Sequence, residues 1–110
     1  MPSPVFLGEF EHLVLIGILS LKDDSGVLAL KAHLDRLAGR PVSRGALYRT
    51  LDRLGDKGWI DWTVDEDNRP ERGGHPKRQL RVTRQGRAVL NASRKTLLQL
   101  WRSVDKELRS

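Results

Sequence analysis

The chain has 110 residues, of which 38% are hydrophobic and 31% charged, with a formal net charge of +6 and no cysteine. This composition is typical of one soluble globular domain and excludes a disordered chain, a disulfide-rich scaffold and a zinc site with thiolate ligands. Because Glu9, Glu11 and His12 interrupt the apolar residues near the start, we expect no signal peptide and no membrane span. The absence of cysteine fits the cytoplasm.

The positive charge is concentrated in one stretch. Residues 69–87 contain seven Lys or Arg residues and one acidic residue, Glu71, which gives a local charge of +6 and leaves zero for the rest of the chain. A concentrated patch favours a polyanionic partner, since an evenly spread excess would serve only solubility. An arginine-rich loop that touches no nucleic acid is the alternative.

The first predicted helix covers residues 8–21, where apolar residues recur at helical spacing on more than one side. We expect this helix to contact both its own core and another surface, such as a second subunit. His12 lies early on it beside Glu9 and Glu11. No second histidine or cysteine stands at ligand spacing from His12, so we expect a polar surface or interface role and no metal site.

The segment KDDSG, residues 22–26, predicts a turn that opens a second helix, with three candidate N-caps: Asp23, Asp24 and Ser25. That helix runs to about Ala38, and Gly39 ends it. Its apolar stripe consists of Val27, Leu30, Leu34 and Leu37.

A third helix is predicted between Ser43, a suitable N-cap, and Gly58, which can adopt the left-handed conformation after the last turn. Its inner face carries Leu47, Leu51 and Leu54, and its outer face carries Tyr48, Arg49, Asp52 and Arg53. Arginine pairs with guanine edges or phosphate, and tyrosine reaches phosphate or a thymine methyl, so this face suits a DNA major groove. A half-buried, solvated helix is the alternative. The short connection from the second helix gives the spacing of a helix-turn-helix.

Two alternating stretches follow, residues 59–66 and residues 77–83, separated by a Gly- and Pro-rich basic segment. They predict a β-hairpin with Leu80 and Val82 facing inward. A hairpin directly after a helix-turn-helix is a wing.

The last predicted element begins after Thr83 as N-cap and runs from Arg84 to about Arg109, roughly 39 Å at 1.5 Å per residue. Its apolar seam consists of Leu90, Leu97, Trp101, Val104 and Leu108. A small domain cannot cover so long a stripe, which favours a dimerisation helix. The predicted fold is therefore mainly α with a two-stranded β wing. It combines a winged helix-turn-helix domain at residues 1–83 with a C-terminal dimerisation helix at residues 84–110.

The chain resembles the PadR family of bacterial transcriptional regulators in three motifs that cover most of its length in the family's order. These are LGEFEHLVLIGIL at 7–19, VSRGALYRTLDRLGDKGWI at 42–60 and ERGGHPKRQLRVTRQGRAVL at 71–90. The short C-terminal part resembles the family's small subgroup, in which one helix forms the dimer arm. The sequence departs from the family at Ser25 and at Gln79 and Leu80, where members often carry aromatic residues.

The resemblance implies a role for each matching position. On the recognition helix, Ser43, Arg44, Tyr48 and Arg49 match positions that contact phosphates and base edges, and Arg53 completes the predicted DNA face. In the wing, the matching positions are Arg72, Gly73, Gly74, Lys77 and Arg78. The first and last helices correspond to the dimer interface, with Phe10, Leu97, Trp101, Val104 and Leu108 as interface residues. Some members line a pocket for a small-molecule effector with tryptophan near Trp101, whereas interface packing is the simpler role for this residue.

The prediction is a homodimeric, sequence-specific transcriptional repressor that binds double-stranded DNA at a pseudo-palindromic operator. The alternative is a winged-helix protein-interaction module whose basic wing binds an acidic partner protein. We do not expect an enzyme or a cofactor, because the three histidines fall on separate elements and no serine has an evident base partner.

Overall fold

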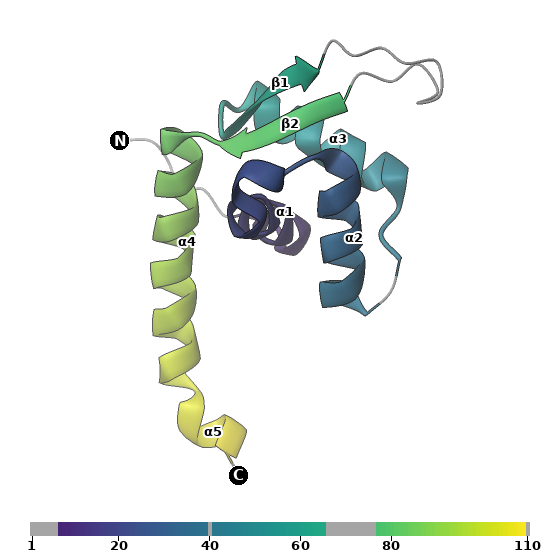
Figure 1. Ribbon diagram of the computed structural model, residues 1–110. Helices are drawn as coiled ribbons and strands as arrows, with labels where there is room; N and C mark the ends of the chain where they lie inside the picture. Colours follow the sequence, from purple (N-terminus) through teal and green to yellow (C-terminus); the bar gives the residue numbers. More distant parts are fainter. Residues whose placement is uncertain (1–6, 40, 66–76, 110) are drawn as a thin grey trace.

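The structure is a computed structural model that describes residues 7–39, 41–65 and 77–109. Helices α1, α2 and α3 pack beneath an antiparallel hairpin, and a long helix extends away from them as an arm (Figure 1). In order, the elements are α1 (Glu9–Leu21), the 3₁₀ helix η1 (Lys22–Asp24), α2 (Val27–Ala38), α3 (Arg44–Asp56), β1 (Ile60–Asp65), β2 (Lys77–Val82), α4 (Arg84–Ser103) and α5 (Asp105–Arg109). The predicted winged-helix class is confirmed. Among the helices of the described ranges, none combines the length and the apolar composition that a membrane-spanning segment needs.

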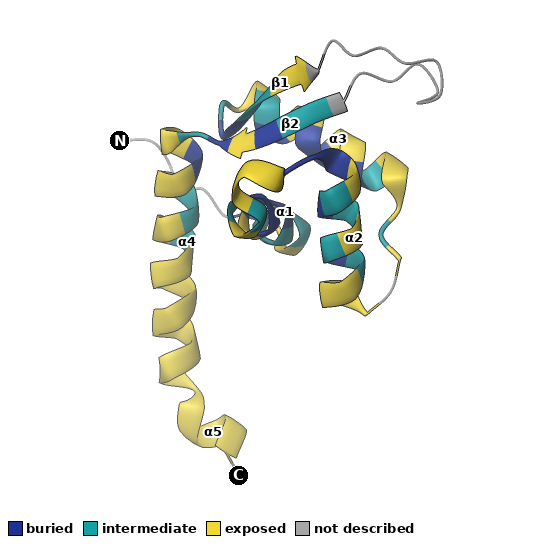
Figure 2. Cartoon of the chain, viewed as in Figure 1, coloured by how far each residue is buried: buried dark blue, intermediate teal, exposed yellow. Residues whose placement is uncertain are grey.

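The hydrophobic core lies where the three short helices meet the inner face of the hairpin. Figure 2 shows buried residues on these facing surfaces, whereas most of α4 is exposed. The side chains at the centre of the core are Val14, Leu15, Leu30, Leu34, Leu47, Leu51 and Leu54. The predicted inner face of α3 is therefore confirmed, while Leu37, predicted to lie on the stripe of α2, is 57% exposed.

The start of α2 differs from the prediction. Gly26 is its N-cap and no side chain caps it, because residues 22–24 form η1 and turn the candidate aspartates to the surface. Ser25 is fully buried and donates its hydroxyl hydrogen bond to the carbonyls of Ile18, at 3.0 Å, and Lys22, at 2.6 Å. Its own carbonyl accepts a hydrogen bond from the amide of Leu80. Ser25 thus ties α1 to β2, and its hydroxyl hydrogen bond to α1 is one that an aromatic side chain without a hydroxyl could not form.

The connection between α2 and α3 is held by one carboxylate. Asp35 accepts hydrogen bonds from the Lys31 ammonium at 2.8 Å and from the Val42 amide at 2.6 Å. These bonds lower the pKa of Asp35 below its ordinary value of 3.8. Gly39 ends α2 at φ 69°, in the left-handed region, as predicted. The Asp35 carboxylate therefore holds Val42, which precedes the N-cap of α3, against the last turns of α2.

Replacing Asp35 by asparagine is expected to lower the melting temperature at neutral pH by about 4 °C, because an amide holds both donors more weakly. The folded pKa lies below 3.8, so the carboxylate stabilises the fold fully above 3.8, and this contribution is lost as the pH falls through the folded value. The difference in melting temperature between wild type and variant should therefore become smaller below pH 3.8, and thermal unfolding over a pH series measures it. Asp24→Asn, at an exposed position of η1, is the control. If the difference in melting temperature between wild type and Asp35→Asn did not change with pH, the stabilising role given to the Asp35 carboxylate would be contradicted.

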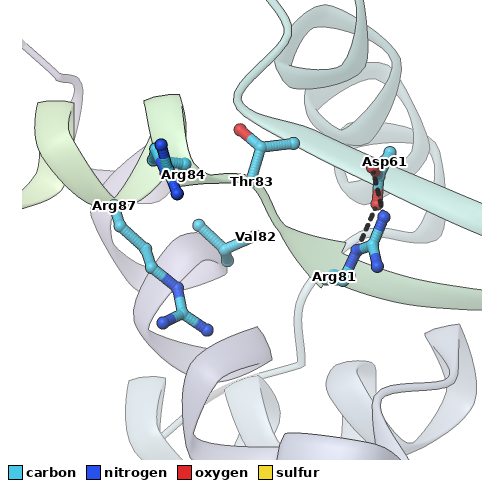
Figure 3. Close-up of a pocket in the computed structure, with 6 residues that line it drawn as sticks. All are labelled: Asp61, Arg81, Val82, Thr83, Arg84 and Arg87. Carbon is cyan, nitrogen blue, oxygen red and sulfur yellow. Dashed lines mark hydrogen bonds and ion pairs between the residues drawn. The ribbon is translucent and has the colours of Figure 1, made fainter.

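The hairpin pairs β1 with β2 so that Ile60 faces Val82 and Trp62 faces Leu80. Leu80 and Val82 are buried, as predicted. On the opposite face, the Arg81 guanidinium donates two hydrogen bonds of 2.9 Å to the Asp61 carboxylate (Figure 3). These bonds lower the pKa of Asp61. The sheet therefore packs Leu80 and Val82 on its inner face and presents an ion pair on its outer face.

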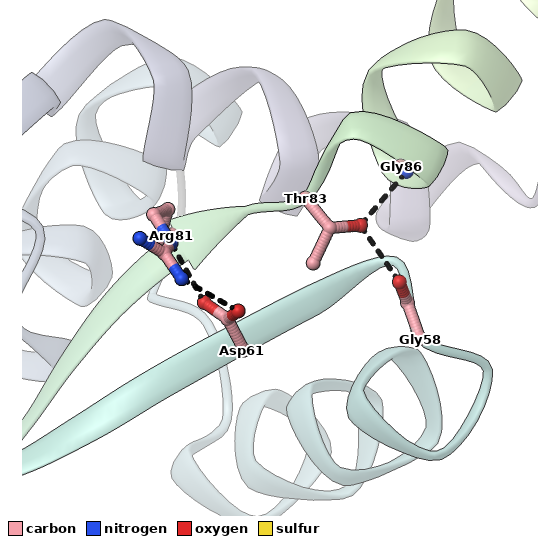
Figure 4. A network of polar contacts seen from close by, with 5 residues as sticks. All are labelled: Gly58, Asp61, Arg81, Thr83 and Gly86. Atoms are coloured by element: carbon pink, nitrogen blue, oxygen red, sulfur yellow. Dashed lines mark hydrogen bonds and ion pairs between the residues drawn. The ribbon is translucent and has the colours of Figure 1, made fainter.

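The root of the arm is fixed at Thr83. Its hydroxyl accepts the hydrogen bond of the Gly86 amide at 3.0 Å and donates one to the Gly58 carbonyl at 2.7 Å (Figure 4). Thr83 is thus the predicted N-cap of α4, and it also joins α4 to the corner between α3 and β1. Gly58, at φ 78°, has the predicted left-handed conformation.

The prediction of one continuous helix to Arg109 is wrong, because the helix is interrupted at Val104, between α4 and α5. The Ser103 hydroxyl bonds to the Leu100 carbonyl at 2.6 Å, and the Val104 amide bonds to the Trp101 carbonyl at 3.2 Å. A serine that competes for backbone carbonyls and a β-branched residue both weaken a helix. The arm therefore ends in a short separate turn.

Candidate nucleic-acid interface

Helix α3 presents a buried face and an exposed basic face. Leu47, Leu51 and Leu54 are fully buried and anchor it to the core. On the other side, Arg44, Tyr48, Arg49, Asp52 and Arg53 are exposed. Three guanidinium groups and one phenol thus project from a helix whose backbone is held rigidly from below.

The N-terminus of α3 is capped as predicted. The Ser43 hydroxyl accepts a hydrogen bond from the Ala46 amide at 3.3 Å. Arg44 follows in the first turn and is exposed. A helix N-terminus with free N–H groups and an arginine beside it attracts phosphate oxygens.

The arginines in the middle of α3 differ in their contacts. The guanidinium of Arg49 lies beside Gly45, with its Nη1 3.4 Å from the place a Cβ of residue 45 would take. Arg53 donates a hydrogen bond of 3.3 Å to the Thr50 hydroxyl. Both side chains keep most of their donors for an external acceptor.

Of the predicted wing residues, Arg72, Gly73 and Gly74 lie outside the described residues, as does the side chain of Lys77. Arg78 is described, and it folds against α3. Its Nη1 donates to the Asp52 carboxylate at 3.1 Å, and its guanidinium lies 4.5 Å from the centre of the Trp62 ring and 5.5 Å from that of Tyr48. The structure therefore brings together one predicted wing residue and one predicted recognition residue.

Two members of this cluster, Asp52 and Trp62, were not predicted as site residues. Strand alternation contained the signal, because Arg78 has the same parity as the inward residues Leu80 and Val82. Asp52 stands four residues after Tyr48 on the same face of α3. Neither the alternation in β2 nor the spacing on α3 predicts that α3 packs against Arg78.

A second basic surface lies at the root of the arm. A hollow of about 490 Å³ lies here, and its lining includes Val82, Arg84 and Arg87. Figure 3 shows the side chains that line it. Arg81 also lines it but is paired with Asp61. The hollow adds positive charge beside the hairpin, where the patch of residues 69–87 was predicted.

The predicted interface residues fall into two groups. Phe10 is half-buried and packs against the protein's own core. By contrast, Leu97 and Trp101 on α4, Val104 at the break and Leu108 on α5 are exposed by 40 to 62%. Beyond its first two turns, the arm therefore carries an uncovered apolar surface.

His12 joins the first helix to the arm. Its Nε2 lies 2.6 Å from the Ser93 hydroxyl and its Nδ1 lies 3.1 Å from the Gly8 carbonyl. Both ring nitrogens are thus used in polar contacts, in line with the predicted polar role. Among the described residues, no group of three or more His, Asp or Glu side chains could hold a metal ion.

Comparisons with known proteins agree with this architecture. The family model described as the transcriptional regulator PadR-like family matches residues 15–92. Among solved structures, the X-ray structure of a PadR-like transcription factor from Bacteroides fragilis is similar, with a TM-score of 0.69 and 19% sequence identity. The match covers 88% of this chain and 87% of that chain. No curated protein sequence matches.

Proposed function

The chain belongs to the PadR-like family of transcriptional regulators, and we propose that it is a homodimeric repressor that binds a pseudo-palindromic operator. Members of this family regulate transcription and are not enzymes. The protein is accordingly a DNA-binding transcription regulator. We place its action in the cytoplasm, where bacterial DNA lies.

The observation that carries the proposal is the exposed face of α3. Its three arginines and Tyr48 project from a helix that Leu47, Leu51 and Leu54 hold against the core. Arginine forms paired hydrogen bonds with guanine, and tyrosine reaches phosphate or a thymine methyl. In the proposal, Arg49, Tyr48 and Arg53 enter the major groove, while Ser43 and Arg44 contact phosphates at the helix N-terminus.

The wing adds contacts that depend little on sequence. In the proposal, Arg72, Gly73, Gly74 and Lys77 follow the DNA backbone, and Arg78 belongs to the same surface. Phosphate contacts raise affinity and salt dependence for all sequences alike. Sequence choice is then left to α3.

The exposed apolar surface of the arm supports a dimer. Trp101 on α4 is 58% exposed and Leu108 on α5 is 62% exposed, although both are large apolar residues. Pairing two arms would cover this surface and bring two α3 helices to successive major grooves, roughly 34 Å apart. Such a dimer would repress transcription by occluding the promoter. A small-molecule effector between the arms would act by favouring one spacing of the two helices.

Replacing Trp101 by glutamate is expected to raise the dissociation constant of the dimer by about 30-fold or more, because it buries a charge in an apolar contact. Light scattering over a concentration series measures this shift. Lys95→Glu, an exposed position of α4, is the matched control and should leave the dimer intact. Two variants with equal dissociation constants would contradict the proposed interface.

Selection of binding sites from random duplex DNA with the purified protein tests the whole proposal. A two-fold symmetric consensus is the expected result. Absence of any enrichment would overturn the proposal and favour the protein-interaction module, whose basic wing would bind an acidic partner instead.

A further inference from the structure

Arg78 is held by three groups from two other elements. Asp52 and Tyr48 come from α3, where they stand four residues apart, and Trp62 comes from β1. The Asp52 carboxylate accepts a hydrogen bond of 3.1 Å, and the two rings lie 5.5 Å and 4.5 Å from the guanidinium. Aromatic faces and a carboxylate are the groups that attract a planar cation.

The burial of Arg78 and Asp52 indicates towards which element the Arg78 guanidinium points. The Arg78 side chain is only 27% exposed, whereas that of Asp52 is 58% exposed. Arg78 lies on the inward-facing side of β2, in register with Val64 and with the same parity as Leu80. Its charge is therefore turned towards α3 and is balanced by a carboxylate on the proposed DNA-binding face.

We propose that Arg78 is a positioning residue that ties the wing strand β2 to α3, and that Asp52 is a specificity-determining residue that withholds this cation from DNA phosphates. The inference rests on the proposed function, since it assigns roles within the same DNA-binding surface. It gives Arg78 a role other than a phosphate contact.

Two consequences follow from this arrangement. The contact of Arg78 with α3 fixes the angle between the wing and α3, so the side chains that read bases are already oriented before the protein binds DNA. The carboxylate also keeps one arginine from adding affinity that is equal for every sequence. Specific binding should therefore need the pair, and non-specific binding should not.

The principal test removes both charges at once with Asp52→Ala combined with Arg78→Ala, which leaves the net charge unchanged. Fluorescence anisotropy measures binding to the duplex enriched by selection and to a scrambled duplex of the same length, over a salt series. We expect affinity for the enriched duplex to fall about tenfold, with the scrambled duplex and the salt slope unchanged. A slope shallower by about 0.9, with equal losses on both duplexes, would make Arg78 a phosphate contact and overturn the inference.

The single variant Asp52→Ala tests the withholding of the cation. Once released, Arg78 can reach phosphate, so affinity for the scrambled duplex should rise about fivefold and the salt slope should steepen by about 0.9. The preference for the enriched duplex should fall. Unchanged scrambled affinity would overturn the role given to Asp52.

The outer face of the same hairpin offers a matched control. Asp61→Ala with Arg81→Ala removes another Asp–Arg pair that joins only β1 to β2, and it should leave both affinities unchanged. Asp52→Asn with Arg78→Gln repeats the principal test with uncharged polar side chains that keep more of the packing than alanine does, and it serves if the alanine pair unfolds at a low temperature. If selection enriches no duplex at all, the proposed function is wrong. If only the Asp52 and Arg78 variants miss their expected results, the inference alone is wrong.

Discussion

Replacing Gly86 by alanine is expected to destabilise the protein by about 3 kcal/mol and to lower its melting temperature by about 15 °C. A Cβ at this position would lie 2.0 Å from the Trp59 carbonyl oxygen and 2.9 Å from Val82 Cγ1. The nearest obstacle is backbone, which no rotamer change can move. That carbonyl also accepts the hydrogen bond of the Thr83 amide, so α4 could retreat only by breaking the junction that fixes the arm.

Two other helical glycines provide matched controls for this experiment. At Gly45 a Cβ would lie 3.4 Å from the end of the Arg49 side chain and 3.8 Å from the Ser43 hydroxyl, both ordinary van der Waals contacts. Gly45→Ala should therefore raise stability by up to about 1 kcal/mol through helix propensity. At Gly17 the contact is the flexible end of Leu30 at 2.8 Å, so its variant should fall between the other two. Thermal unfolding gives the order of stability of the three variants. A Gly86→Ala protein as stable as wild type would contradict the expected clash with the Trp59 carbonyl.

Replacing Arg49 by alanine is expected to weaken binding to the enriched duplex by about 10- to 100-fold, the range for losing a paired hydrogen bond to a base edge. Binding to a scrambled duplex should change far less, because Arg49 is proposed to read sequence. Tyr48→Ala should also weaken specific binding. Light scattering should show that both variants remain dimers, since neither residue lies on the arm.

The control for this experiment is Lys95→Ala, which also removes one cation but does so on the arm. It should leave the affinity for the enriched duplex unchanged at fixed salt. If both Arg49→Ala and Tyr48→Ala bound that duplex as tightly as wild type, the assignment of α3 as the recognition helix would fail. Anisotropy titrations at one salt concentration separate these outcomes.

Much of the fold could be predicted because its signals are local. Ser43 and Thr83 cap helices whose amides lie within three residues of them. The inner leucines of α3 follow from helical periodicity, and Leu80 and Val82 follow from strand alternation. The break at Val104 escaped prediction because the apolar stripe continues across it, whereas the hydroxyl of Ser103 competes for a backbone carbonyl.

The candidate site could be predicted only in part. Periodicity identified Tyr48, Arg49 and Arg53 as outward residues of α3, and the structure exposes all three. The basic patch pointed to the hairpin, and Arg78 was expected to serve it as a wing residue. That Arg78 lies against Asp52 did not follow from charge, because a cation on a strand has many possible neighbours.

Apart from η1, the break at Val104 and the exposed Leu37, the sequence alone determined which segments are helices or strands and which of their faces are apolar, since both depend on spacings of two to four residues. The tertiary structure alone decided which faces meet. Arg78 reaches Asp52 across 26 residues, and His12 reaches Ser93 across 81. Such contacts depend on how whole elements pack, and the periodicity of one element carries no information about the element that covers it.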